Sequence, residues 1–279
     1  MASWLAEARE RFHATCLAGP ITLTRGVPSI ADVANGPSRE IATALVARLG
    51  LSRQTAAKPA GQTAGAMFET ACRDFLAACL AQLAHLRPGL MGVEKGRAIT
   101  QFDQYAHLEE LRLLADASRE LKTHLGTDYL IKPDIVVLRA PLTDEQINRH
   151  ADLVDASVAG LSALRFAQNT RPTLHASISC KLTIRSDRVQ NTRSEALNLI
   201  RNRKGRLPHI AAVTAEPTPS RIAAIALGTG DIDCVYHFAL PELRAVLAEQ
   251  GRDSADLVET MIDGQRLRDI ADLPLDLVV

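Results

Sequence analysis

The sequence feature that most constrains the fold is a strand-like run that passes directly into a helix-like run, in residues 174–205. Residues 174–184 are mostly apolar or β-branched, which is typical of a strand. From Arg188, polar residues recur at alternating spacings of three and four, including Asn191 and Glu195, so they share one face of a helix. Lys181 interrupts the apolar run, where a core does not accept an unpaired ammonium. The segment therefore predicts a strand and a helix that direct charged side chains at one region.

Strands and helices alternate through much of the remaining chain. The pattern predicts strands at 129–138, 210–215 and 234–238, a possible strand at 89–99, a long loop at 18–37, and helices at 2–17, 38–49, 61–86, 101–125, 143–170, 220–227, 240–250 and 253–262. Such alternation is typical of an α/β protein with a mixed central β-sheet flanked by α-helices. No linker-like stretch divides residues 1–279, so we expect a single domain.

The charge of the chain is neutral as a whole but uneven along it. Lys and Arg total 32, as do Asp and Glu. Residues 181–206, however, hold eight Lys or Arg against two acids, a local charge of +6 (8 − 2). A basic patch on a neutral protein suits a partner that is anionic at one place, such as nucleic acid. The alternative is an ordinary solvated helix face.

The cysteines predict a reducing, cytoplasmic environment. There are five, at positions 16, 72, 79, 180 and 234, with no CxxC pair, so we expect free thiols and no zinc site. Cys180 has no clear histidine partner in the pattern, so we interpret it as a small packed residue and not as a nucleophile. We expect no membrane span, because no apolar run approaches about 20 residues.

Asp134 and Lys181 are candidates for metal-assisted phosphate chemistry. Asp134 follows Pro133 at the start of an apolar run, and Lys181 lies 47 residues later (181 − 134). On neighbouring strands, the carboxylate would hold Mg²⁺, and the lysine would orient or deprotonate an attacking water and stabilise charge on a phosphate. This arrangement resembles that of the PD-(D/E)xK nucleases. Alone the pattern is weak, because an aspartate at a strand start is commonly a turn former.

The second acid of that motif is displaced in this chain. The position two before the lysine should be acidic, but it is Ser179. Glu195, on the following helix, is the expected replacement, and Glu69 could supply another carboxylate, so that two metal ions bracket the scissile phosphate. The plain alternative for Glu69 is a solvated acid near a helix N-terminus, where the helix dipole favours it.

Arg185, Asp187 and Arg188 are candidates for reading base pairs. An arginine matches the two major-groove acceptors of guanine, and an aspartate matches the amino group of cytosine. These three side chains at a helix N-terminus could read two adjacent G·C pairs, and a two-fold related copy would complete the palindrome CCGG. The alternative is that Ser186 or Asp187 caps the helix and that both arginines are solvated.

Several stretches of the chain resemble type II restriction endonucleases of the CCGG-recognising branch, within the PD-(D/E)xK superfamily. They include SISCKLTIRSDR at 177–188, TDYLIKPDIVV at 127–137, AGQTAGAMFETAC at 60–72 and DLPLDLVV at 272–279. The resemblance implies the restriction-endonuclease α/β core and Mg²⁺-dependent cleavage of double-stranded DNA at GCCGGC, after the first G, with a 5′ overhang. It also implies two Mg²⁺ ions per active site and a homotetramer that holds two duplexes.

The resemblance also implies roles for individual residues. The catalytic set would be Asp134, Lys181, Glu195 and Glu69. The metal ligands would be Asp134, Glu195 and the backbone carbonyl of Cys180. The DNA-binding set would be Arg185, Asp187 and Arg188 for CCGG, Gln62 for a minor-groove contact and Asp32 for the outer G·C pair.

Two other classes of function remain open from the residues. A DNA-binding protein without nuclease activity would need the basic helix but not the acids beside Lys181. A nuclease that recognises DNA junctions by shape would need the acids but not Arg185 and its two neighbours.

Overall fold

A computed structural model of the protein describes residues 2–50, 61–89, 91–126, 129–228, 230–251 and 253–279. Within this part of the chain, the main sheet has six strands in the order β3-β4-β5-β6-β7-β8. The β3–β4 and β4–β5 pairs are antiparallel, whereas the three pairs from β5 to β8 are parallel. The strands are β3 (Met91–Lys95), β4 (Ile135–Arg139), β5 (Thr173–Lys181), β6 (His209–Thr214), β7 (Cys234–His237) and β8 (Leu267–Asp269). The predicted α/β class with a mixed central sheet is thereby confirmed.

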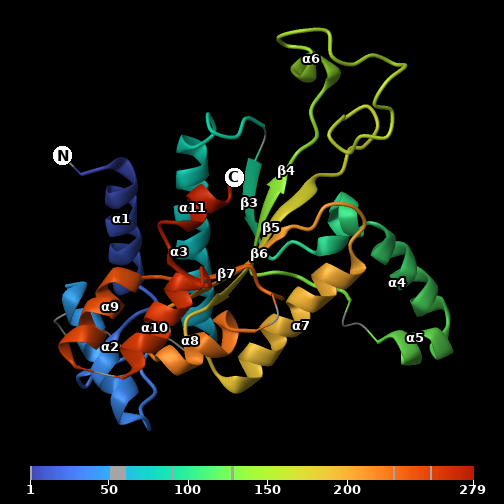
Figure 1. Ribbon diagram of the computed structural model, residues 1–279. Coiled ribbons are helices and arrows are strands. Elements are labelled where there is room, and N and C mark those ends of the chain that lie inside the picture. The colour runs from blue at the N-terminus through green and yellow to red at the C-terminus, as the bar shows by residue number, and fades with distance from the viewer. Residues whose placement is uncertain (1, 51–60, 90, 127–128, 229, 252) are drawn as a thin grey trace.

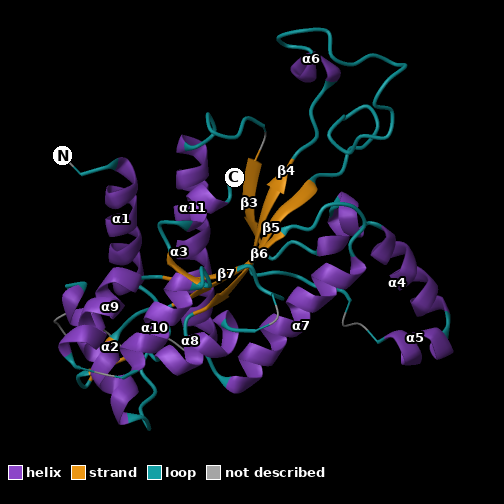
Figure 2. Ribbon diagram, in the orientation of Figure 1, coloured by secondary structure: helices purple, strands orange, loops and turns teal. Residues whose placement is uncertain are grey.

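Helices lie on both sides of this sheet (Figures 1 and 2). The parallel strands are joined by helical crossovers, as parallel pairing requires. These helices are α7 (Ser186–Asn202), α8 (Pro219–Ala226), α9 (Leu240–Glu249) and α10 (Ser254–Asp263), followed by the short α11 (Leu273–Asp276). The predicted strands and helices between residues 210 and 262 are confirmed within a few residues. Strand β8, which has only three residues, was not predicted.

The long helix α3 (Gly61–Gln82) joins the N-terminal region to the sheet. It contacts α1 (Trp4–Ala18) on one side and β3 and β5 on the other. Its apolar side chains at spacings of three and four, among them Phe68, Cys72 and Phe75, are buried as predicted. The predicted end at Leu86 was wrong, because the helix stops at Gln82 and Leu86 is exposed.

Two other predicted helical regions were wrong in detail. Residues 143–170 contain only α6 (Asp144–Ile147) and otherwise form an extended excursion between β4 and β5 (Figure 1). Arg165 holds this excursion together, because its buried guanidinium binds Asp144 and the backbone carbonyls of Asp155 and Val158. The 101–125 region is divided at Ser118 into α4 (His107–Ala117) and α5 (Arg119–Leu125), preceded by 3₁₀ turns at Ile99–Gln101 and Asp103–Tyr105.

The predicted loop at 18–37 contains a small hairpin, β1 (Leu23–Thr24) and β2 (Val27–Pro28). Its turn residues Arg25 and Gly26 both have positive φ, as a tight hairpin turn requires. Helix α2 (Gly36–Arg48) begins two residues earlier than expected, because Asn35 is the N-cap and accepts a hydrogen bond from the Ser38 amide. The Ser38 hydroxyl instead accepts a bond from the backbone amide of Asp32.

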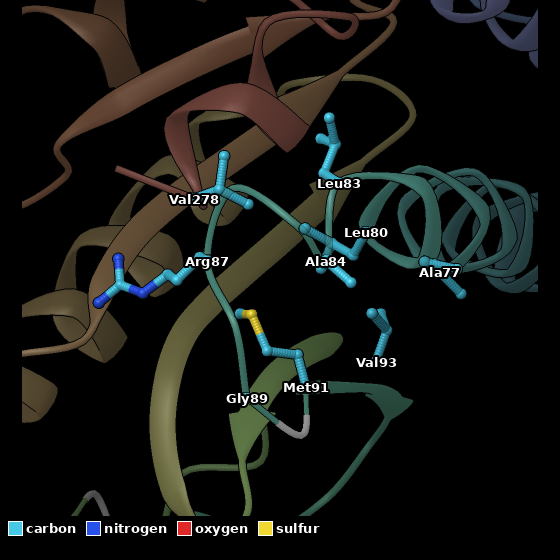
Figure 3. Close-up of a pocket in the computed structure, with 10 residues that line it drawn as sticks. Ala77, Leu80, Leu83, Ala84, Arg87, Gly89, Met91, Val93 and Val278 are labelled. Carbon is cyan, nitrogen blue, oxygen red and sulfur yellow. The ribbon is translucent and has the colours of Figure 1, made fainter. Parts of the chain in front are cut away.

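The C-terminal tail packs against the body, as its apolar sequence indicates. Arg87 donates a hydrogen bond to the backbone oxygen of Val279, and a ring nitrogen of His175 lies 2.7 Å from the backbone oxygen of Leu277. A small cavity of about 150 Å³ lies between Val278, the end of α3 and β3 (Figure 3). Its lining is apolar apart from Arg87 and contains none of the predicted site residues.

Candidate active site

Asp134 and Lys181 lie side by side, as predicted, because β4 and β5 are adjacent in the sheet. The Oδ2 atom of Asp134 is 2.8 Å from the Lys181 ammonium. The same oxygen accepts a hydrogen bond from the Cys180 amide at 2.7 Å and a longer one from the Ser179 hydroxyl at 3.4 Å. Three consecutive residues at the end of β5 therefore donate to one carboxylate oxygen. The Asp134–Lys181 pair is an ordered ion pair and not merely a feature of the sequence.

Glu69 and Glu195 reach the same place from two different helices. Both border a cleft of about 330 Å³, Glu69 from α3 and Glu195 from α7. Lys181 and the two residues that follow it, Leu182 and Thr183, also line this cleft. The predicted residues that line this cleft are Gln62, Glu69, Cys180, Lys181, Arg185 and Glu195. Six residues predicted from separate stretches thus share one concavity.

The pKa values of both glutamates are raised above their usual value in this cleft. Burial raises the pKa of Glu69, and the neighbouring Asp134 raises it further, while Lys95 and Lys181 only partly oppose this effect. Burial likewise raises the pKa of Glu195; Lys181 opposes the shift and Asp134 adds to it. By count, the site holds three carboxylates, those of Glu69, Asp134 and Glu195, against the two lysines Lys95 and Lys181. Clustered carboxylates with raised pKa values are typical of functional sites.

Lys181 experiences the opposite balance. Burial lowers its pKa, but the attraction and hydrogen bond of Asp134, helped by Glu195, outweigh burial and leave the pKa above its usual value. Lys181 is consequently an ammonium at neutral pH. It can donate hydrogen bonds to a phosphate or to a water molecule beside it.

The donor chemistry of this cleft fits a hard divalent cation. No three His, Cys, Asp or Glu side chains in the described part of the chain already surround a point as metal ligands. Asp134 instead turns its Oδ2 atom to Lys181. Carboxylate oxygens supplemented by water are nevertheless what Mg²⁺ prefers, and the uncompensated negative charge favours a cation there.

Arg185 lies at the edge of the cleft, at the N-cap position of α7. The expected cap was Ser186 or Asp187, so the helix begins one residue earlier than that prediction. The backbones of Asp187 and Arg188 form the first turn of α7, but their side chains lie outside the described part of the structure. Gln62 is exposed in the first turn of α3 and lines the same cleft.

Asp32 is held in the loop before α2. It forms an ion pair with Arg221 of α8, a residue to which sequence analysis assigned no role. That hydrogen bond, together with one from the Ala34 amide, keeps the pKa of Asp32 below its usual value, and Arg185 contributes to the same shift. Arg185 is therefore close enough to act on Asp32 electrostatically, which connects the loop to the cleft.

The fully buried side chain of Glu216 holds the backbone next to Arg185. Glu216 accepts hydrogen bonds from the amides of Ile184 and Thr218 at 2.8 and 3.1 Å, and it lies 3.9 Å from Arg221. It thereby fixes the backbone directly before Arg185. The only sequence signal was its position in the segment EPTPSR at 216–221, between a strand and a capped helix.

Lys95 is a second residue that sequence analysis missed. Its ammonium lies 3.5 Å from Glu69 Oε2, although the two residues are 26 positions apart (95 − 69). A lysine near the end of a short strand carries no pattern that predicts this contact. Cys180 is buried beside Cys72, as expected of a small packed residue.

The mixed sheet, the Asp134–Lys181 pair and the surrounding acids define a nuclease of the restriction-endonuclease-like class. A model of the NgoMIV restriction enzyme family matches residues 12–279. The chain is also 50% identical to the type II restriction enzyme NgoMIV of Neisseria gonorrhoeae, over 281 aligned positions that cover 98% of each chain. The chain belongs to the NgoMIV restriction enzyme family and is a type II restriction endonuclease, a site-specific deoxyribonuclease that binds double-stranded DNA. In the described residues, no helix is both long and apolar enough to cross a membrane.

Proposed function

We propose that this enzyme hydrolyses double-stranded DNA at GCCGGC, after the first G, and leaves a 5′ overhang. The observation that carries the proposal is that Lys181, Glu69 and Glu195 line one cleft together with Arg185, while Asp134 holds Lys181 by an ion pair of 2.8 Å. A protein that only binds DNA does not require three carboxylates and an ammonium beside the scissile phosphate.

Mg²⁺ is the cofactor that this donor set suits, with two ions per active site. Asp134, Glu195 and the backbone carbonyl of Cys180 would hold the metal, and Glu69 would complete the acidic rim. When bound, Mg²⁺ supplies positive charge to the phosphate in the transition state. Lys181 donates hydrogen bonds that orient the attacking water and stabilise charge on the phosphate oxygens.

Recognition of the sequence would come from the elements beside the cleft. Arg185 and Arg188 would each bind a guanine and Asp187 the paired cytosines, so that two copies read CCGG. Gln62 would contact the minor groove and Asp32 the outer G·C pair. The pairing of Asp32 with Arg221, and the influence of Arg185 on Asp32, support a location of that loop near the DNA.

The assembly we propose is a homotetramer that holds two duplexes, each bound by two copies of the chain. We treat residues 1–279 as one domain, which the single cluster of buried apolar residues from Ala8 to Leu277 supports. A cytoplasmic location agrees with five free, buried cysteines.

Cleavage of matched plasmids tests the proposal. One plasmid carries a single GCCGGC site, and its control carries GCCGCC at the same position. With Mg²⁺, only the first should be cut, and sequencing the ends should place the break after the first G on both strands. Cutting of both plasmids would overturn the sequence assignment. The cofactor assignment would be overturned if the GCCGGC plasmid were not cut with Mg²⁺ but were cut when another divalent cation replaced it. Sedimentation of the enzyme with DNA should give the mass of four chains.

A further inference from the structure

Lys95 contacts one turn of α3 through two hydrogen bonds and one ion pair. An ammonium has three N–H donors and no acceptor. The Lys95 Nζ atom lies 2.8 Å from Thr70 Oγ1, 3.1 Å from the backbone oxygen of Ala66 and 3.5 Å from Glu69 Oε2. The first two contacts fix the ammonium on the helix, and the third places its charge beside the carboxylate that enters the cleft.

The strand that carries Lys95 also contacts the other side of the acidic site. Lys95 is opposite Ile135 in the β3–β4 register, next to Asp134. The following amide, that of Gly96, donates a hydrogen bond to the backbone oxygen of Asp134 at 3.2 Å. Gly96 has a φ of +58°, a conformation that favours glycine, and a Cβ there would lie 3.2 Å from the Lys132 side chain. Two consecutive residues therefore hold the segments that present Glu69 and Asp134.

The charge balance shows why Glu69 needs this support. The site has three carboxylates, those of Glu69, Asp134 and Glu195, and Lys181 is already engaged by Asp134 at 2.8 Å. Both Lys95 and Glu69 are partly shielded from water, with side-chain exposures of 29% and 25%. Repulsion among the acids is stronger in such surroundings than in open solvent. Without a cation beside it, Glu69 would be pushed away from Asp134.

We propose that Lys95 is a positioning residue that holds the carboxylate of Glu69 at the catalytic cleft. The inference rests on the proposed role of Glu69 in cleavage, and Lys95 acts through Glu69 without itself touching DNA. It does not depend on which sequence the enzyme cuts.

A double-mutant cycle tests the inference on the full-length enzyme. The variants are Lys95→Met, which keeps a long side chain but removes the charge, Glu69→Gln, and the two combined. Cleavage by each is measured under single turnover at the sequence that the wild-type enzyme cuts. Lys95→Met alone should slow cleavage about 10- to 100-fold, the loss typical when the partner that orients an active-site ligand is removed. In the Glu69→Gln background, the same change should cost less than about two-fold, because its target has gone.

Three further measurements separate positioning from a general loss of structure. Lys95→Arg, which retains the charge, should recover part of the rate. Lys122→Met, which breaks an exposed ion pair between Lys122 of α5 and Asp116 of α4, is the matched control and should cut normally. The melting temperature of Lys95→Met without metal should stay within about 2 °C of wild type.

The outcomes are distinct. Equal losses from Lys95→Met in both backgrounds would show that Lys95 does not act through Glu69. A normal rate for Lys95→Met, or a normal rate for Glu69→Gln, would equally overturn the inference. The proposed active site as a whole would fail separately, if Lys181→Ala retained cleavage.

Discussion

The candidate active-site cleft and the junction between α1 and the C-terminal half both contain partly buried charges, but they balance those charges in opposite ways. At the junction, Arg9 makes bidentate contacts of 2.6–2.9 Å with both Glu242 and Asp269. Burial raises the pKa of Glu242, but the hydrogen bonds and charge of Arg9 outweigh burial, and the net shift is downward. In the cleft, the pKa values of Glu69 and Glu195 are shifted upward.

The difference indicates which cluster is structural and which is chemical. At the junction, every carboxylate has a fork of donors, so the charges stabilise the fold. In the cleft, three acids share two lysines, and the remaining negative charge is available to bind a metal cation, which would in turn attract a phosphate. The predictions below aim to break or sharpen this contrast, in order of decreasing effect.

Replacing Lys181 should have the largest effect, and the effect should be confined to the rate of DNA cleavage. Lys181→Ala removes the ammonium beside Asp134, so cleavage should fall by roughly 1000-fold or more. Binding of specific DNA in Ca²⁺ should remain, because the residues proposed to read the bases are intact. Single-turnover cleavage and a gel-shift assay measure the two properties, and near-normal cutting would remove Lys181 from the mechanism.

Replacing Arg9 should affect mainly stability. Arg9→Leu leaves Glu242 and Asp269 partly buried with no cation, which should cost about 3–5 kcal/mol of unfolding free energy. The control is Arg244→Leu, because Arg244 makes a similar bidentate pair with Glu259 in an exposed position. That change should cost no more than about 1 kcal/mol. Urea denaturation measures the unfolding free energy of both variants. Similar losses of unfolding free energy in the two variants would contradict the contrast between buried and exposed ion pairs.

His237, beside the Arg9 junction, should make the protein sensitive to acid. Burial lowers the pKa of His237 to about 4, although Asp269 and Glu242 oppose the shift. Its Nδ1 atom accepts a bond from the Ala239 amide at 3.2 Å, so the ring must be neutral. The neutral, buried ring of His237 stabilises the folded state. Because the ring titrates near pH 6.5 in the unfolded chain, this stabilisation is complete above pH 6.5 and is lost as the pH falls toward 4.

The loss attributable to His237 should reach on the order of 2–3 kcal/mol at pH 4. It is measured as the difference in unfolding free energy between wild type and His237→Gln across pH 4–8. The variant should be less stable at pH 7, and the gap should narrow in acid. A gap that does not change with pH would show that His237 does not titrate in this way.

Neutralising Glu195 should have the smallest effect on stability, and it should stabilise the protein, whereas the Arg9 substitution destabilises it. Because the folded pKa of Glu195 is raised, its ionised form costs stability above that pKa, and the cost disappears below the unfolded value of 4.5. Glu195→Gln should therefore raise the melting temperature by about 1–2 °C at pH 8 without metal. Glu242→Gln should lower it. Calorimetry at pH 8 and pH 4 measures both, and a lower melting temperature for Glu195→Gln would place Glu195 with the structural acids.

Parts of the site were predictable because local patterns placed them. The apolar runs predicted β4 and β5, and so the proximity of Asp134 and Lys181. Glu195 was predicted because helical spacing put it on the face of α7 that follows Lys181. The helix predicted at 143–170 was wrong because Arg165 binds carbonyls and Asp144 across an irregular loop, and no periodicity in the sequence records such contacts.

The sequence by itself indicated most of the strands and helices, the acids and lysine that the structure brings together, and the resemblance to CCGG-recognising restriction enzymes. Only the tertiary structure decided that Lys95 lies against Glu69, that Arg221 holds Asp32 and that Glu216 fixes the backbone before Arg185. The physical reason is the range of the interactions. Periodicity and capping act over a few residues, whereas these ion pairs and hydrogen bonds join segments that are brought together only when the helices pack on the sheet.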